Sequence, residues 1–532
     1  MKREIEIITK FAKSSVKNQA VLDKIKRKIA KKDKGQILGN TALLEAYHSL
    51  VKAKRIKPDN NLEGAFRIKK IRSLSGIVVV SVLTKPYPCP GKCIFCPTQA
   101  GAPKSYIKEE PAVSRAIMLN YHPYRQVQTR IRALEATGHP TDKIDLRIIG
   151  ATWSFYPRRY QSWFIKECFR AANEFKRKKS RRNYDLVTLQ KANEKTKHRI
   201  IGIMIETRPD FINLREIQRL RSFGITMVEL GVQSIYDNVL KANKRGHLIY
   251  ETIQATRILK DAGFKICYQM MPNLLSSNMK MDLKMFEQLF INPDFRPDYL
   301  KIYPCALLKE ANLFEIWQQG KYKPYSANDL IGLLTKIKKN IPYYCRIQRI
   351  IRDIPSSYVI DGGAKISNMR QMLEALAKRQ GWQCKCIRCR EVKDNFDAKE
   401  KLYLFREDYD ASQGKEIFLS FENKKRTKLY SLLRLRIPSF IFHKKAGGQL
   451  PELKNSAIIR EVHTYGQLVG LFQKSKFAQH KGLGKKLVGI AQSIAKKEFH
   501  LEKMAVISGI GVKNYYRHLG YRTKKTYMIK RV

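Results

Sequence analysis

Short apolar runs of strand length alternate with longer amphipathic stretches through the middle of the chain. The seven strand-like runs are residues 76–83, 145–152, 200–210, 227–234, 265–272, 299–307 and 344–351. Strands that alternate with helices form βαβ units, in which the strands are parallel. The pattern therefore predicts an α/β fold, a partial parallel (β/α) barrel with its site at the carboxyl ends of the strands.

The segments on either side of this barrel have different patterns. The first 75 residues are basic, and apolar positions recur at helical spacing within them, as in the stretch AVLDKIKRKIA. From residue 401 onward, β-rich runs precede an amphipathic helix, which is a mixed α+β order. We therefore expect a basic helical region at 1–75, the barrel at 76–375, a cysteine-containing linker at 376–400 and a mixed domain at 401–532.

The chain also carries a large positive charge. It has 104 Lys and Arg against 46 Asp and Glu among 532 residues, a formal net charge of +58, and the run KRKKSRR at 176–182 is especially dense. A general lysine bias or a high-salt habitat is one explanation, because net charge alone is unspecific. We favour a polyanionic partner, RNA, bound through its phosphates at the basic N-terminal region and at this run.

Hydropathy argues against a membrane location. No apolar run approaches the roughly 20 residues that a membrane span needs. The first ten residues, MKREIEIITK, mix acids with bases and contain no apolar signal core. We expect a cytoplasmic protein with no membrane partner.

Three cysteines follow the first predicted strand in a loop that is rich in Pro and Gly. Cys89, Cys93 and Cys96 have the spacing C-x3-C-x2-C. Three thiolates can hold a [4Fe–4S] cluster and leave one iron open. This spacing after a first barrel strand is typical of radical S-adenosylmethionine (SAM) enzymes, in which the open iron binds SAM. A zinc knuckle is the alternative, but it would need a fourth ligand nearby, and His122, which could serve, lies far along the chain.

Other residues at strand ends fit the same interpretation. Gly150 stands in the turn after the second predicted strand, and Arg208 and Gln233 stand at the ends of the third and fourth. We interpret all three as SAM contacts. For each residue taken singly, a capping or loop role is the alternative.

A second group of cysteines lies in the linker. Cys384, Cys386 and Cys389 have the spacing C-x-C-x2-C, which is too compact for an iron cluster with three protein ligands. A structural zinc with a fourth ligand from elsewhere is the favoured interpretation. Free thiols are the alternative.

The C-terminal domain contains a phosphate-binding pattern. Gln479, Gly482 and Gly484 form Q-x-x-G-x-G at the start of an amphipathic helix, and MAVISGIGVKNYYRHLGY follows at 504–521. Backbone N–H groups at such a helix start can bind a pyrophosphate. The combination is typical of the GNAT acyltransferase fold, which binds acetyl-CoA.

A radical SAM pattern followed by a GNAT pattern resembles the catalytic subunit of Elongator, the radical SAM/GNAT tRNA uridine carboxymethyltransferases that stand alone in archaea and some bacteria. The resemblance is carried by segments that span nearly the whole chain, among them SGIVVVSVLTKPYPCPGKCIFCP, VELGVQSIYDNVLKANKRGH and KMAVISGIGVKNYYRHLGY. It implies carboxymethylation of tRNA at C5 of the wobble uridine. Acetyl-CoA would supply the two-carbon unit, and a SAM-derived 5′-deoxyadenosyl radical would take hydrogen from the acetyl methyl group. We also expect an electron donor for the cluster and a homodimer.

The resemblance also implies site residues. Lys143, in TDKID, would contact acetyl-CoA from the barrel side, and together with Tyr516 it is the expected catalytic pair. The expected acetyl-CoA contacts of the C-terminal domain are Glu461, Val462, His463, Thr464, Gln479, Gly482, Leu483, Gly484, Lys485 and Tyr516.

An alternative of a different class is a protein lysine acetyltransferase with a purely structural iron–sulfur domain. A structural cluster would not need polar SAM contacts at several strand ends. The basic N-terminal region also favours tRNA over a basic protein as the substrate.

Overall fold

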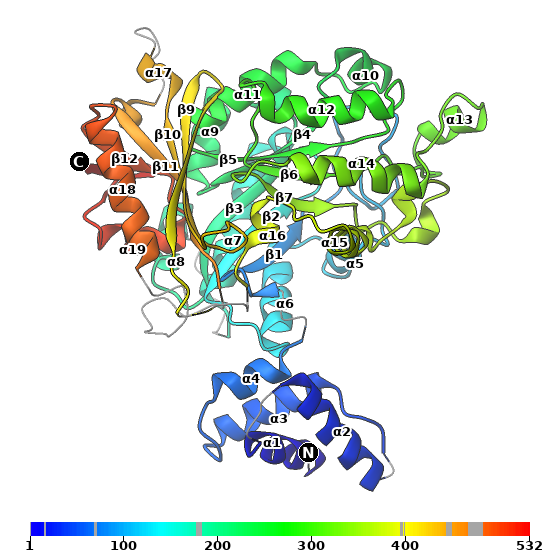
Figure 1. Cartoon of the computed structure of the whole chain (residues 1–532), viewed down its shortest axis with the longest axis vertical. Coiled ribbons are helices and arrows are strands. Elements are labelled where there is room, and N and C mark those ends of the chain that lie inside the picture. Colours follow the sequence, from blue (N-terminus) through cyan, green and yellow to red (C-terminus); the bar gives the residue numbers. More distant parts are fainter. Residues whose placement is uncertain are drawn as a thin grey trace.

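The computed structural model describes residues 2–14, 18–33, 35–68, 72–176, 184–393, 397, 399–442, 450–466 and 482–532. Figure 1 shows three parts: a lobe of N-terminal helices, a central barrel and a second sheet beside it. Of the run 176–182, the structure describes only Lys176, and Gln479 also lies outside the described residues.

The central part is a half-barrel of seven parallel strands in sequential order, as predicted. The strands are β1 (Val78–Leu83), β2 (Lys143–Ile149), β3 (Arg199–Thr207), β4 (Met227–Gln233), β5 (Lys265–Met270), β6 (Tyr299–Ile302) and β7 (Arg346–Ile350). Each lies within or beside its predicted run. The third and sixth end earlier than predicted, because Pro209 and Pro304 follow them and cannot continue a ladder of hydrogen bonds.

Helices cover the outside of the barrel. They are α5 (Pro111–Met118), α6 (Pro123–Ala136), α7 (Arg158–Asn173), α8 (Leu186–Asn193), α9 (Leu214–Ser222), α10 (Asp237–Ala242), α11 (Ile249–Asp261), α12 (Met279–Ile291), α13 (Leu313–Gln318), α14 (Ala327–Asn340), α15 (Met369–Arg379) and α16 (Ile387–Arg390). Most of them pack their apolar faces on the outward residues of the strands in one large core, whereas α10 and α13 pack with the cysteine loop and α5 packs beside the end of β1.

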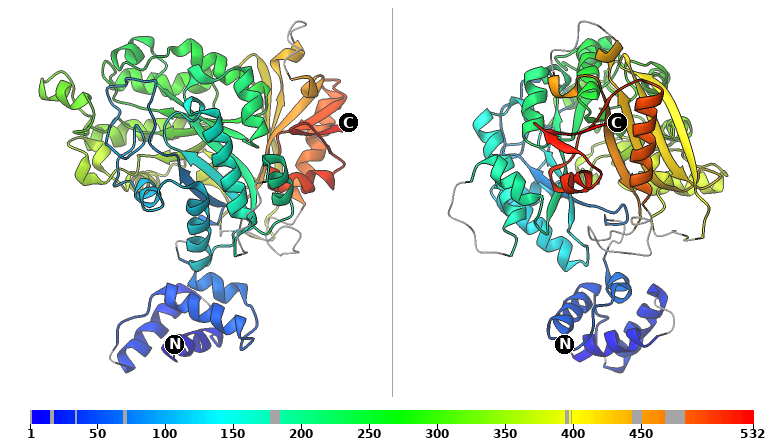
Figure 2. Two further views of the ribbon diagram at one scale, coloured as in Figure 1. Left: turned by 180° about the vertical axis from the view of Figure 1, so that it is seen from behind. Right: turned by 90° about the vertical axis from the view of Figure 1, so that its left-hand side faces the viewer.

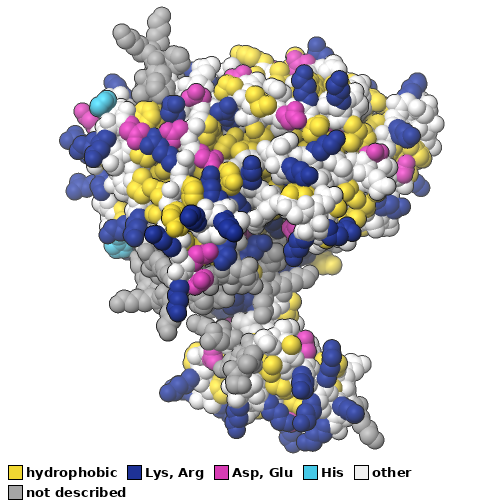
Figure 3. Space-filling model, viewed as in Figure 1, with side chains coloured by type: hydrophobic (Ala, Val, Ile, Leu, Met, Phe, Trp, Pro, Cys, Tyr) yellow, Lys and Arg dark blue, Asp and Glu magenta, His cyan; other side chains and the backbone are white. Residues whose placement is uncertain are grey.

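The N-terminal lobe is helical, as predicted, and has a core of its own. It consists of α1 (Lys2–Ala12), α2 (Gln19–Lys32), α3 (Asn40–Lys52) and α4 (Asn60–Phe66), packed around Phe11, Leu22, Tyr47 and Phe66. The lobe stands apart from the barrel in both views of Figure 2. Lys and Arg side chains gather on its surface in Figure 3.

The second sheet is mixed, which confirms the predicted α+β order. Its strand order is β13-β14-β12-β11-β10-β9-β8, and only β11 and β12 are parallel. The strands are β8 (Tyr403–Ala411), β9 (Gly414–Glu422), β10 (Leu429–Ile437), β11 (Ser456–Thr464), β12 (Lys503–Val506), β13 (Arg522–Lys524) and β14 (Tyr527–Arg531). The helices are α17 (Ser439–Phe442), α18 (Leu483–Lys497) and α19 (Lys513–Arg517), and α18 packs on the face away from the barrel (Figure 1).

Buried arginines join the second sheet to the barrel. Arg434, Arg436 and Arg460 are at most 1% exposed. Arg460 donates from Nη1 to Asp298 Oδ1 at 2.9 Å and to Glu416 Oε2 at 2.8 Å. Asp298 is a barrel residue just before β6. Burial alone would raise the pKa of Asp298, but Arg460, Lys260 and Arg434 outweigh it and hold this pKa well below its ordinary value of 3.8.

Among the described residues, no helix is long and apolar enough to cross a bilayer. This finding agrees with the hydropathy of the sequence.

Replacing Asp298 by Asn should destabilise the protein strongly, because Arg460, Lys260 and Arg434 would stay buried after losing a shared countercharge. Breaking a buried pair by removing one partner costs about 3–5 kcal/mol. The measurement is the midpoint of urea unfolding. Because the folded pKa is depressed, this contribution is present above pH 4 or so and is lost as the pH falls toward the folded value.

Asp410→Asn is the matched control. The Asp410 side chain is 73% exposed and pairs with Lys415 at 3.2 Å, so the expected change is below about 1 kcal/mol. Equal effects of the two substitutions would contradict a central role for Asp298.

Candidate functional site

The first three cysteines lie in the loop after β1, at the carboxyl end of the barrel. Cys93 Sγ accepts a hydrogen bond from Arg245 Nη1 at 3.4 Å, and Cys89 Sγ accepts one from Gly91 N at 3.5 Å. The Cys96 thiol and then Arg245 lower the pKa of Cys93 to about 5, although burial opposes the shift. Cys93 is therefore stabilised as the thiolate, the form that ligates a metal, whereas its hydrogen bond with Cys96 and then burial raise the pKa of Cys96.

A cavity of about 230 Å³ opens beside these cysteines, over the carboxyl ends of the strands. The predicted SAM contacts Arg208 and Gln233 both line it. Arg208 Nη1 and Gln233 Oε1 are buried and have no hydrogen-bond partner in the protein. Buried polar atoms without a partner are costly, so this cavity suits a polar ligand such as SAM beside a [4Fe–4S] cluster.

Gly150 supports the cavity from the turn after β2. Its φ is +126°, and a Cβ added there would lie 2.2 Å from Thr84 Oγ1, so only glycine fits. Gly150 N donates to Glu206 Oε2 at 3.3 Å. The next residue, Ala151, lines the cavity with φ +74°, a left-handed conformation that is uncommon for alanine.

Sequence reasoning missed the charged residues inside this cavity. Glu206, Glu229 and Lys301 all line it, and Lys301 Nζ lies 2.5 Å from Glu229 Oε1. Burial and then the charge of Glu229 raise the pKa of Glu206 to about 7. The available signal was an acid within each of two otherwise apolar strands, in ETRPD and VELGVQS.

A second cavity, of about 400 Å³, lies at the other end of the strands, between the barrel and the second sheet. Four of the predicted acetyl-CoA residues line it: Glu461, Val462, His463 and Tyr516. Glu461 accepts hydrogen bonds from Tyr299 of β6 and from Arg434 Nε at 2.9 Å, so both parts of the protein fix its side chain. We call this space the interdomain cavity and the first one the cluster cavity.

The strands diverge beside the interdomain cavity. β11 pairs with β12 only over 456–459, and its remaining residues extend past the end of this pairing. Gly484, in the first turn of α18, approaches them: a Cβ added there would lie 3.5 Å from Val462 Cγ1 and 3.1 Å from Tyr515 Oη. Gly482 is the N-cap with φ +72°. The N-terminus of α18 therefore faces the diverging end of β11.

The remaining predicted acetyl-CoA residues border this region without lining the cavity. Leu483 is buried, Lys485 is exposed, and Thr464 ends β11.

Tyr516, which is 7% exposed, stacks edge to face on Tyr515, and burial raises its pKa well above the ordinary value.

Lys143 begins β2 at the same end of the barrel. It is in register with Arg199 of β3, and the segment before α19 packs on β3 so closely that a Cβ at Gly509 would lie 1.9 Å from Ile201 O. Lys143 lines neither cavity in this structure. Burial lowers the pKa of Lys143 to about 8.

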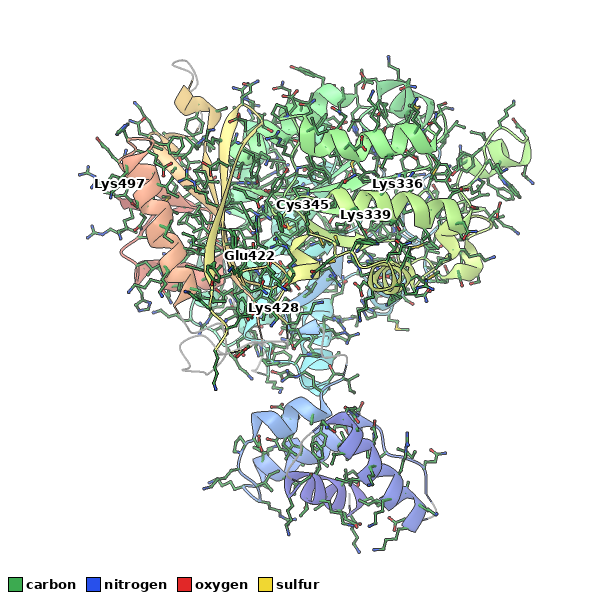
Figure 4. The ribbon with its side chains drawn as sticks, in the orientation of Figure 1. Lys336, Lys339, Cys345, Glu422, Lys428 and Lys497 are labelled. Atoms are coloured by element: carbon green, nitrogen blue, oxygen red, sulfur yellow. The ribbon has the colours of Figure 1, made fainter. Side chains whose placement is uncertain are left out.

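The linker cysteines form a compact trio. The sulfurs of Cys384, Cys386 and Cys389 all lie within 4.8 Å of one another, the single such group of potential ligands that the described part of the chain contains. This spacing fits one tetrahedral ion with Zn–S bonds of about 2.3 Å. The backbone oxygen of Cys345 accepts a hydrogen bond from Ile387 N at 3.0 Å, which connects α16 to the start of β7. Cys345 is labelled near the centre of Figure 4. Zinc stays a prediction.

Comparison with known proteins defines the class first. Residues 87–289 match the family model of the radical SAM superfamily, and residues 297–379 match that of the Radical_SAM C-terminal domain. This class uses a [4Fe–4S] cluster and SAM, in agreement with the predicted cofactors.

Individual relatives narrow the class. The tRNA uridine(34) acetyltransferase of Methanocaldococcus infernus is 44% identical over 478 residues, which cover 87% of each chain. Elongator complex protein 3 of Saccharomyces cerevisiae is 37% identical over 488 residues, 88% of this chain and 85% of that one. A solved structure of the archaeal M. infernus Elp3 with an N-terminal deletion (1–46) matches with a TM-score of 0.74 at 40% identity, covering 86% of this chain and all of that one. The chain belongs to the family of the tRNA uridine(34) acetyltransferases and Elongator complex protein 3.

The two cysteine groups should bind different metals. Cys93→Ala should lose iron and keep zinc, because two thiolates hold an iron cluster poorly, whereas Cys386→Ser should lose zinc and keep iron. Elemental analysis of anaerobically reconstituted protein measures both, so each variant is the control for the other. Iron retained at the wild-type level in Cys93→Ala would show that the ligands are wrongly assigned.

Proposed function

We propose that the protein modifies uridine 34 of tRNA by attaching an acetyl-derived carboxymethyl group to C5 of the base. The observation that carries the proposal is the pairing of two cavities on one barrel. A cavity lined by three cysteines lies at the carboxyl ends of the strands, and a cavity bordered by the second sheet lies at their amino ends. The names of the relatives supply the substrate, uridine 34 of tRNA.

The residues of the cluster cavity would hold the cofactors. Cys89, Cys93 and Cys96 would ligate the cluster, and Arg208 and Gln233 would complete their hydrogen bonds with SAM. When bound, these groups would supply a 5′-deoxyadenosyl radical that can take hydrogen from an acetyl methyl group. A low-potential electron donor is part of the proposal.

The residues around the interdomain cavity would hold acetyl-CoA. The N-terminus of α18, from Gly482 to Lys485, would bind the CoA phosphates through backbone N–H groups. Tyr516 would position the thioester from the wall of the cavity, where its raised pKa keeps the phenol protonated as a donor. Lys143 would contact the same ligand after a modest shift of its side chain.

This assignment divides the chain by role. Residues 1–75 would bind tRNA, and residues 76–375 would bind the cluster and SAM. Residues 401–532 would bind acetyl-CoA, and residues 376–400 would form a linker stabilised by zinc. A cytoplasmic location agrees with a tRNA substrate, and the homodimer stays a prediction.

A protein lysine acetyltransferase is not favoured. The relative from M. infernus is named for a tRNA uridine, and the cluster cavity has buried polar atoms that a structural cluster would leave without partners.

Tyr516→Phe and Lys143→Ala should abolish carboxymethylation while the iron content and the tRNA affinity stay near wild type. A loss of about 3 kcal/mol of transition-state stabilisation already slows a reaction more than a hundredfold. Mass spectrometry of tRNA nucleosides measures the product. Tyr515→Phe, the neighbouring phenol, is the matched control and should keep most of the activity; near wild-type rates in both test variants would refute the assignment.

Deleting residues 1–70 should weaken tRNA binding and flatten its dependence on salt. Each phosphate contact releases counterions, so fewer cations give a shallower slope of log K against log salt concentration. Electrophoretic or fluorescence binding at several salt concentrations measures the slope. A slope equal to that of the full chain would mean that this charge does not contact tRNA.

A further inference from the structure

The two cavities meet inside the barrel. Two residues line both of them: Arg147 of β2 and Gln348 of β7. With the Gln348 amide oriented so that its oxygen faces Arg147, both terminal guanidinium nitrogens donate to it, at 3.1 and 3.2 Å. Arg147 Nε also donates to Asp145 Oδ2 at 2.9 Å. A single layer of side chains therefore separates the interdomain cavity from the cluster cavity.

The interior of this barrel is unusually polar. Barrel interiors are normally filled by branched aliphatic side chains. Here alternate residues of β2 face inward, and they include Asp145 and Arg147. The Arg147 side chain is 23% exposed although it lies within the barrel, because it borders open space on both sides. The barrel interior therefore keeps a polar side open, which we call the lumen, beside a buried apolar group of Met204, Met227, Cys267 and Tyr299.

The wall next to Arg147 is apolar. Met204 lines the cluster cavity and Met227 lines the interdomain cavity, and the two are in register on adjacent strands. Met204 is also in register with Arg147. Methionine is unbranched and repacks easily, so this wall can yield to a flexible chain, while Arg147 and Gln348 offer hydrogen bonds to amides.

We propose that the lumen is a passage through which the acyl-thioester arm of acetyl-CoA reaches the cluster cavity, and that Arg147 and Gln348 form its gate. The inference rests on the proposed function, which requires the acetyl methyl group to meet SAM although the two cavities lie at opposite ends of the strands. The arm is the occupant that fits, because it is long and uncharged, and its β-alanine and cysteamine part next to the thioester is unbranched. The bulkier and charged nucleotide end of CoA stays at the N-terminus of α18.

Two features would allow Arg147 and Gln348 to move apart. Ile347 pairs with Leu300 and Arg349 pairs with Lys301, so Gln348 is the extra residue of a β-bulge. Such bulges change the direction of side chains and occur beside active sites. Glu229 lines the cluster cavity, and its Oε2 is buried without a hydrogen-bond partner. Arg147 can therefore exchange Asp145, on the interdomain side, for Glu229, on the cluster side, as the arm passes.

Two cysteine substitutions on β1 test the passage. Val79 lines the interdomain cavity and Ser81 lines the cluster cavity, and Ser81 is in register with Arg147. The two residues are on the same face of the strand, about 7 Å apart. In each variant, Val79→Cys or Ser81→Cys, the cluster-loaded full chain is treated anaerobically with the mixed disulfide of CoA and 2-thiopyridine.

The cysteine thiolate attacks the CoA sulfur, a CoA–cysteine disulfide forms, and 2-thiopyridone leaves. Peptide mass spectrometry at the substituted position measures the labelling rate. We expect labelling in both variants and protection of both by excess acetyl-CoA. Labelling at Val79→Cys without labelling at Ser81→Cys would overturn the passage and leave the proposed acetyl-CoA site intact. Labelling at neither position would overturn both.

Substitutions of Gln348 test the gate within the Ser81→Cys background. Gln348→Ala removes a hydrogen bond to a charged group, which is worth at least about a tenfold change in an equilibrium, so labelling should accelerate by about tenfold or more. Gln348→Trp should fill the lumen and slow labelling at Ser81→Cys without slowing it at Val79→Cys. Unchanged rates in Gln348→Ala, with wild-type iron content and circular dichroism, would remove Gln348 from the gate even if the passage stands.

Discussion

The geometry of the interdomain cavity depends on the buried ion pairs between the second sheet and the barrel. Arg460 of β11 donates to Asp298, and Arg436 of β10 donates from Nη2 to Asp261 Oδ1 at 2.7 Å. Burying charges is expensive unless each finds a partner with good geometry. A sliding or rotated sheet would leave several arginines unpaired, so the network specifies one relative placement of the two parts.

The ion pairs that dock the sheet also position residues that line the interdomain cavity. Arg460 is adjacent to Glu461, whose carboxylate joins Arg434 and Tyr299. His463 lies two residues further along β11. Its Nε2 donates to the backbone oxygen of Ser75, which lies just before β1, at 2.7 Å. The same strand that docks the sheet therefore also forms the cavity wall, so docking and site geometry cannot vary independently.

The sequence predicted the elements better than their contacts. The seven barrel strands are recognisable because their apolar runs are buried on a parallel sheet, and the cysteines because ligand spacing is local. In contrast, the stretch LRLRIP is compatible with a strand whose arginines face solvent. Nothing local shows that Asp261 and Asp298, more than 130 residues away, bury these arginines. The proximity of Arg147 and Gln348 was equally hidden, since 201 positions separate them in the chain.

The polar lumen and the strong interface both follow from one constraint, namely that the interior of the barrel has to admit a ligand. A barrel that keeps its interior open gives up the aliphatic packing that normally stabilises it. The outer helices and the docked sheet must supply that stability instead, and the sheet covers the amino ends of the strands, where the lumen would otherwise open to solvent. Closing the barrel with a second sheet keeps part of the interior available to a ligand. In the described part of the chain, Arg147, Gln348 and the apolar group around Met204 and Met227 then lie between the two cavities.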